Sequence, residues 1–184
     1  MIRQNIIIQI LLFIILLVID RLTKYWAVQV LKAKTSIVLI PNILEFRYLE
    51  NKGAAFGFLQ NQQWLFYIIT AFVLAIIVYF WIRIIHLSKS YISIEPEKFH
   101  KKTFMDRSFL NYILAFLAAG AVGNLIDRIA HTYVVDFIYF KLINFPIFNF
   151  ADICVSLSAV ILVVFFIFVF KEDPEFVLLG GKKK

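Results

Sequence analysis

Four long apolar runs limit what this chain of 184 residues can fold into more than any other feature. They cover about residues 6–26, 64–85, 109–129 and 150–170, and each can cross a bilayer as a helix of about 20 residues. Hydrophobic residues make up 62% of the chain, so a water-soluble fold would expose apolar surface that one core could not bury. The sequence therefore predicts a mainly α, polytopic membrane protein with four transmembrane helices in a single domain, residues 1–184.

The first apolar run imitates a signal peptide, because it follows the basic residue Arg3. No small-residue cleavage site comes after it, and the helical pattern continues to Trp26, so we interpret it as an uncleaved helix. Within it, Asp20 and Lys24 are four residues apart and lie on one helix face within ion-pair reach. This spacing fits a functional pair and an ordinary interfacial pair equally well.

Two segments between the apolar runs have other patterns. Residues from about 34 to 58 hold a β-branched run at 37–40, a turn signal at Pro41-Asn42 and alternating apolar and charged residues up to Tyr48. This pattern predicts a small β-sheet outside the hydrocarbon layer. Residues from about 86 to 107 are polar and basic and contain Pro96, which predicts a flexible loop.

The residues that follow the predicted sheet are polar, flexible or small. Asn51 and Lys52 precede Gly53, Ala54 and Ala55, a composition that suits close approach of an extended ligand. On these residues alone we favour a plain loop.

Four helices that alternate in direction bring distant polar residues to one membrane face. In the third helix, Gly120, Asn124 and Asp127 recur at helical spacing, so they point toward the bundle. The candidate site residues gathered at this face are Asp20, Lys24, Asn51, Gly53, Asn124, Asp127, Arg128, Asp136, Asn149 and Asp152.

The distribution of basic residues gives an orientation. Eleven of the 19 Lys and Arg residues lie on the side of the termini and eight on the side of the candidate site. Cytoplasmic loops are enriched in Lys and Arg, so this modest bias favours cytoplasmic termini and a site that faces outward. The net charge of +7 is spread between apolar segments, so we expect contact with anionic lipid and no nucleic acid.

Cysteine and histidine usage argues against a disulfide or a metal site. Cys154 is the single cysteine, so no internal disulfide forms, and we expect a small core residue. His86, His100 and His131 are far apart and have no ligand spacing. We predict no metal and no cofactor.

Asp136 and Asp152 carry the chemistry that we expect. We expect Asp136 to end the third loop and Asp152 to begin the fourth helix, so they come from different segments near the membrane boundary. Two carboxyl groups in a poorly solvated site do not both ionise easily. One then keeps its proton, so the pair supplies a general acid and a general base. A water molecule between them can attack an amide bond. Each aspartate alone fits a helix cap better, whereas the pair beside Asn124, Arg128 and Asn149 favours catalysis.

Four segments resemble, in order, the four sequence boxes of bacterial lipoprotein signal peptidase (signal peptidase II), an intramembrane aspartic peptidase family. The segments are residues 20–26, 51–56, 123–128 with 134–137, and 148–152, so the resemblance spans nearly the whole chain. The chain departs from a minimal member in the segment 86–107, which is long. The resemblance implies a catalytic dyad of Asp136 and Asp152 that cleaves prolipoproteins just before a diacylglyceryl-modified cysteine.

The same resemblance implies a place and supporting roles. The place is the bacterial inner membrane, with a small periplasmic sheet that cradles the substrate and a site at the outer boundary. By this resemblance, Asp20 and Lys24 are a supporting pair on the first helix, and Asn51 and Gly53 belong to a substrate-contacting loop. The polar network around the dyad consists of Asn124, Asp127, Arg128 and Asn149.

Two other classes of protein also fit parts of the sequence. A small ion-coupled transporter needs buried carboxylates, but its sites usually lie near the membrane midplane between repeated halves, which this chain lacks. A structural subunit of a membrane complex would need only the small-residue stripe at Ala115, Ala119 and Gly123. It leaves the boundary aspartates unexplained. For the peptidase we expect a monomer.

Overall fold

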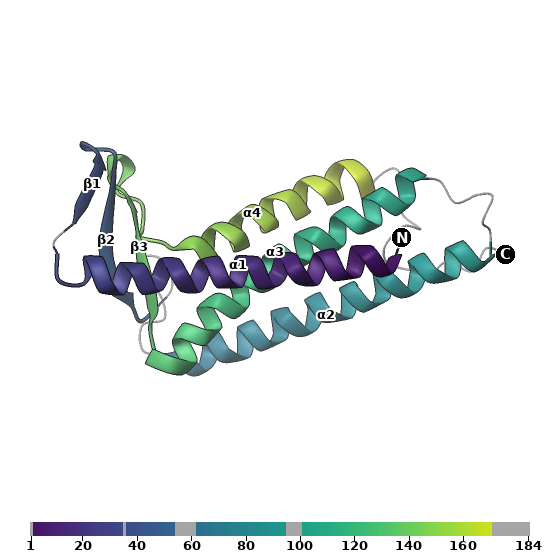
Figure 1. Cartoon of the computed structure of the whole chain (residues 1–184), viewed down its shortest axis with the longest axis horizontal. Helices are drawn as coiled ribbons and strands as arrows, with labels where there is room; N and C mark the ends of the chain where they lie inside the picture. The colour runs from purple at the N-terminus through teal and green to yellow at the C-terminus, as the bar shows by residue number, and fades with distance from the viewer. Residues whose placement is uncertain (1, 35, 54–61, 95–100, 171–184) are drawn as a thin grey trace.

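The computed structural model describes residues 2–34, 36–53, 62–94 and 101–170. Four helices form its body, and a small sheet lies at one end of them, far from the start of the first helix (Figure 1). The helices are α1 (Ile2–Leu31), α2 (Gln63–Ile94), α3 (Lys101–His131) and α4 (Phe150–Phe165), which continues as the π-helical turn η4 (Phe166–Phe170).

Each helix holds a stretch that is long and apolar enough to cross a membrane. The stretches are Gln4–Leu31, Gln63–His86, Ser108–His131 and Phe150–Phe168. Half of the α3 window is buried, against 6–22% in the other three helices, so α3 is the central helix. The exposed faces carry large apolar side chains such as Phe72, which suits contact with lipid. The predicted fold class, four transmembrane helices with a small sheet, is confirmed.

The sheet has three antiparallel strands in the order β1-β2-β3. They are β1 (Ile37–Ile40), β2 (Leu44–Asn51) and β3 (Val134–Phe140). The first two lie within the predicted segment, and Asn42 in their turn has a positive φ of 60°. The third was expected to be loop, so the placement of Asp136 in a loop was wrong. A β-branched and aromatic run surrounds this aspartate, which favours a strand.

The predicted loop over residues 86–107 is largely helical. Helix α2 continues to Ile94 and α3 begins at Lys101, which leaves residues 95–100 outside the described part. Polar residues do not end a helix as proline or glycine does, so both helices extend past their apolar stretches. Composition marks where the bilayer ends and not where the helix ends.

Aromatic packing fixes the sheet against the end of α1. Trp26 meets Phe46 of β2 and Phe137 of β3, with ring centres 5.3 and 6.1 Å away. Ala27 and Val135 lie in the same buried cluster. Since Phe137 directly follows Asp136, this packing fixes the position of the aspartate relative to the end of α1.

Close contact between α3 and α4 depends on glycine. A Cβ atom on Gly120 would lie 2.5 Å from the carbonyl oxygen of Ala151, and one on Gly123 would lie 2.6 Å from a carboxylate oxygen of Asp20. Gly123, from the small-residue stripe predicted from the sequence, therefore contacts α1, and Gly120, from the neighbouring polar stripe, contacts α4.

Candidate active site

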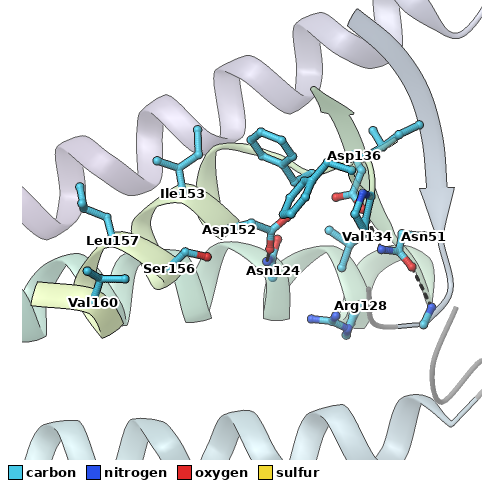
Figure 2. A pocket seen from close by; sticks show the side chains of 15 residues that line it. Asn51, Asn124, Arg128, Val134, Asp136, Asp152, Ile153, Ser156, Leu157 and Val160 are labelled. Atoms are coloured by element: carbon cyan, nitrogen blue, oxygen red, sulfur yellow. Dashed lines mark hydrogen bonds between the residues drawn. The ribbon is translucent and has the colours of Figure 1, made fainter. Parts of the chain in front are cut away.

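A cavity of about 640 Å³ opens between the sheet and the N-terminal part of α4. Asp136 from β3 and Asp152 from α4 both line it, and Figure 2 shows their side chains on its adjoining walls. Asn51, Asn124, Arg128 and Ser156 are its other polar lining residues. Segments more than 80 residues apart in the sequence thus contribute to one site.

Asn149 connects the two aspartates and is fully buried. Its side-chain nitrogen donates to Asp136 Oδ1 at 2.6 Å, and its side-chain oxygen accepts from the backbone N–H of Asp152 at 3.0 Å. The same nitrogen lies 3.2 Å from Asn124 Oδ1. The Asn149 side chain therefore links the Asp136 carboxyl group to the backbone of Asp152.

Asp136 is buried, with 2% of its surface exposed, and both of its oxygens accept hydrogen bonds. Besides the bond from Asn149, Oδ2 accepts from the Asn51 amide at 2.7 Å. Burial raises the pKa of Asp136 to about 7; repulsion from the Asp152 carboxylate adds to this rise, while the bonds from Asn51 and Asn149 oppose it. Asp136 can therefore hold a proton near neutral pH.

Asp152 belongs to the capping box that starts α4. Its Oδ2 accepts from the backbone N–H of Asn149 at 3.0 Å, and its Oδ1 accepts from the Asn124 amide at 2.7 Å. The helix-cap interpretation therefore describes only part of its role, because the Asp152 side chain also lines the cavity. For Asp136 that interpretation was wrong, since Asp136 lies within a strand.

A cluster of buried charges lies behind the cavity. Lys24 contacts Asp20 at 3.2 Å and Asp127 at 3.0 Å, and it donates to Asn124 Oδ1 at 2.8 Å. The bond to Oδ1 orients the Asn124 amide so that its nitrogen points at Asp152. The spacing of Asp20 and Lys24 left two interpretations open, and this contact favours a supporting role.

The ten candidate residues fall into two groups. Asn51, Gly53, Asn124, Arg128, Asp136 and Asp152 line the cavity. Asp20, Lys24, Asp127 and Asn149 are buried behind it. Ala54 and Ala55, which we also considered for ligand contact, lie outside the described residues.

Arg128 lies on α3 between the cavity and α2. Its guanidinium carbon is 4.4 Å from the centre of the Phe66 ring, and its carbonyl oxygen accepts from the Tyr67 hydroxyl at 2.8 Å. Figure 2 shows the side chain extending from α3 below Val134. Stacking on Phe66 leaves the planar donors of the guanidinium available at the cavity wall.

Two features of the site were not predicted from the sequence. Ile153, Leu157 and Val160 extend the cavity along α4 as an apolar wall, which only the packing of the helices reveals. Arg21 joins the charge cluster, although its position next to Asp20 placed it on another helix face. Its charge within the first apolar run was the available signal.

The arrangement suits hydrolysis by a carboxyl pair. It combines a buried acid that holds a proton near pH 7, a second carboxyl group on the same cavity, and amide donors that orient both. Among the described residues, no three His, Cys, Asp or Glu side chains are grouped as a metal site would need.

Comparison with protein families gives one match that covers most of the chain. A family model described as "Signal peptidase (SPase) II" matches residues 12–168. A lipoprotein signal peptidase of Clostridium tetani is 38% identical over 168 residues, which cover 90% of this chain and 94% of that protein. One of Streptococcus agalactiae is 36% identical, over 82% of this chain and 86% of that protein.

Two solved structures have similar folds. Both are titled as bacterial membrane enzymes determined by the in meso method, one at 2.3 Å and one at 1.9 Å resolution. The first has a TM-score of 0.67 and 28% identity and covers 96% of this chain and 92% of that one. The second has a TM-score of 0.64 and 30% identity, over 85% and 90% of the two chains.

Proposed function

The chain belongs to the signal peptidase II family of lipoprotein signal peptidases, and on this premise we propose that it removes signal peptides from prolipoproteins at an aspartate dyad. The dyad is Asp136 with Asp152, and the bond that it cuts is the one just before a diacylglyceryl-modified cysteine. The observation that carries this proposal is the cavity lined by both carboxyl groups, with Asn149 bonded to Asp136 through its side chain and to the Asp152 carboxyl group through its backbone N–H. Because the family consists of peptidases, the transporter and structural-subunit alternatives lose their basis.

The two aspartates take different roles because their surroundings differ. Asp152 lies in the first turn of α4, where the helix dipole favours a negative charge. Burial raises the pKa of Asp136 to about 7. Asp152 is therefore the general base and Asp136 the general acid.

In this mechanism Asp152 accepts a proton from water while the water oxygen bonds to the carbonyl carbon. Asp136 donates its proton to the carbonyl oxygen, and a tetrahedral intermediate forms. When the carbon–nitrogen bond breaks, the leaving nitrogen takes the proton from Asp152, and Asp136 recovers its own from the hydroxyl group as the carbonyl reforms. The dyad then has its original protonation.

Other lining residues bind the substrate. The Arg128 guanidinium suits a peptide carbonyl oxygen, while Asn51 and Gly53 line the cavity at the end of β2. The wall of Leu157 and Val160 suits the apolar part of the substrate, because it continues toward the hydrocarbon layer. Apolar contact there positions the scissile bond at the polar end of the cavity.

The proposal includes a place in the cell. We infer a bacterial inner membrane with both termini in the cytoplasm and the sheet and dyad on the periplasmic side. The excess of Lys and Arg on the side of the termini supports this orientation. We expect the protein to act as a monomer, since Asp136 and Asp152 come from one chain.

The test is a cleavage assay with the purified protein in detergent and a lipidated prolipoprotein. We expect Asp136→Asn and Asp152→Asn to fold and to lose cleavage. Glu50→Gln is the matched control, because it removes a carboxylate of the same sheet that pairs with Lys32 and lies outside the cavity. Cleavage at the normal rate by either aspartate variant would refute the dyad.

A further inference from the structure

Arg21 is a charged residue of α1 that the proposed mechanism does not use. Its guanidinium connects two buried carboxylates: Nη2 lies 2.5 Å from Asp20 Oδ2, and Nη1 lies 2.6 Å from Asp127 Oδ1. Nη2 also donates to the carbonyl oxygen of Gly123 at 2.8 Å. Since the guanidinium is planar and rigid, it fixes the distance between the carboxylates of α1 and α3.

Each of these carboxylates also holds the backbone directly before one aspartate of the dyad. Asp127 Oδ2 accepts from the backbone N–H that precedes Asp136, and Asp20 Oδ1 accepts from the backbone N–H that precedes Asp152. Both distances are 3.2 Å, and the two donors are Val135 and Ala151. The strand and the helix that carry the dyad are thus tied to the pair that Arg21 connects.

Charge balance gives Arg21 a second effect on the site. The cluster has two carboxylates, Asp20 and Asp127, and two cations, Arg21 and Lys24. Without Arg21 the carboxylates would share one ammonium group and repel each other in a buried place. Lys24 would then be drawn toward them and away from Asn124, whose amide it orients toward Asp152.

We propose that Arg21 is a positioning residue: by linking Asp20 to Asp127 it fixes the separation of the segments that carry Asp136 and Asp152. This inference rests on the proposed function, because the separation matters for catalysis only if these two aspartates act together. Catalysis is sensitive to it, since a displacement of about 1 Å can cost about 100-fold in rate.

The test compares Arg21→Gln and Arg21→Lys with the wild type in the purified, full-length enzyme and a lipidated prolipoprotein. For Arg21→Gln we expect kcat to fall about 10- to 100-fold, as for other residues that orient catalytic groups. KM should stay within about twofold, because Arg21 does not line the cavity. Arg21→Lys keeps the charge, but its single ammonium group cannot hold both carboxylates. Its kcat should therefore lie between the values of the wild type and of Arg21→Gln.

Arg83→Gln is the matched control, since it makes the same change in α2 at a residue that does not line the cavity. It should keep the kcat of the wild type. A wild-type kcat in either Arg21 variant, or a raised KM with unchanged kcat, would overturn the inference. If Arg21→Gln does not fold in size-exclusion chromatography, Arg21→Lys decides.

Asp136→Asn and Asp152→Asn in the same assay separate this inference from the proposed function. If they cleave substrate, the dyad itself fails. If they are inactive while Arg21→Gln cleaves at the normal rate, only the positioning role of Arg21 fails.

Discussion

Asn149 combines two functions that separate residues often perform. It is the N-cap of α4, and it donates a hydrogen bond to the Asp136 carboxyl group across the site. The cap needs only an acceptor oxygen, whereas the bond to Asp136 needs the amide nitrogen. A substitution that keeps one group and removes the other can therefore separate stability from catalysis.

Asn149→Ser should keep the cap and lose the contact with Asp136. We expect a melting temperature near that of the wild type in detergent, with most of the cleavage activity lost. Asn149→Ala removes both groups, so its free energy of unfolding should be about 1 to 2 kcal/mol lower than that of Asn149→Ser. Equal activity of Asn149→Ser and the wild type would mean that the amide does not position Asp136.

The raised pKa of Asp136 predicts how stability changes with pH. An aspartate in the unfolded chain has a pKa of about 3.9, whereas folded Asp136 keeps its proton up to about 7. Between these values the folded state binds more protons, so the free energy of unfolding falls as pH rises from about 4 to 7. Asp136→Asn removes this loss. The difference in free energy of unfolding between Asp136→Asn and the wild type should therefore grow by roughly a few kcal/mol in favour of the variant over that range.

Unfolding of both proteins in detergent from pH 4 to 8 checks this prediction, and parallel curves would contradict it. Glu50→Gln serves as a control of opposite sign. Its hydrogen bond from Lys32 lowers the pKa of Glu50, so the wild-type carboxylate adds stability at neutral pH that is lost on acidification. The Glu50 side chain is partly exposed and its partner Lys32 is exposed, so that effect should be small.

At the scale of elements, the contact of α3 with α4 places Asp152. A Cβ atom on Gly120 would meet the Ala151 carbonyl oxygen at 2.5 Å and a Val155 methyl group at 2.8 Å. Gly120→Ala must therefore push α4 away from α3, and such overpacking costs about 1 to 3 kcal/mol. We also expect the cleavage rate to fall by about tenfold or more, because Asp152 moves with Ala151.

Thermal unfolding and cleavage rates measure both effects. Ala130→Val adds methyl groups at an exposed position of the same helix and should change neither strongly. A Gly120→Ala protein with wild-type activity would show that α4 tolerates the shift.

Some elements were predictable because their signals are local. Apolar length alone identified all four helices, and the turn at Pro41-Asn42 identified the hairpin of β1 and β2. The ends of α2 and α3 were not predictable, since polar residues continue a helix outside the bilayer. Strand β3 was missed because it comes almost directly after α3 with no hairpin turn before it, and its pairing with β2 is a long-range contact.

The same distinction holds for the site. Alternation of four helices was enough to gather Asp136, Asp152 and their amide neighbours at one end, because it depends only on the order of the spans. Arg21 was missed, since helix spacing describes the direction of Cβ and not the reach of a long side chain. The apolar wall along α4 depends on how the helices pack, which local pattern does not contain.

At the scale of the whole molecule, the sheet and the cavity lie at one end of the four helices, while α1 begins at the other (Figure 1). In the proposed mechanism, a substrate whose apolar part stays in the bilayer meets Asp136 and Asp152 at that end. The orientation of the molecule therefore decides from which compartment the site is reached.

Cysteine labelling in cells tests this orientation. Lys34 lies beyond α1 on the side of the sheet, His86 lies at the opposite end of the α2 span, and both are exposed. With Cys154→Ala as background, we expect a membrane-impermeant maleimide to label Lys34→Cys once the outer face of the inner membrane is accessible. His86→Cys should react only after the membrane is permeabilised. The reverse pattern would place the two aspartates on the cytoplasmic side, and it would contradict the proposed orientation while leaving the fold intact.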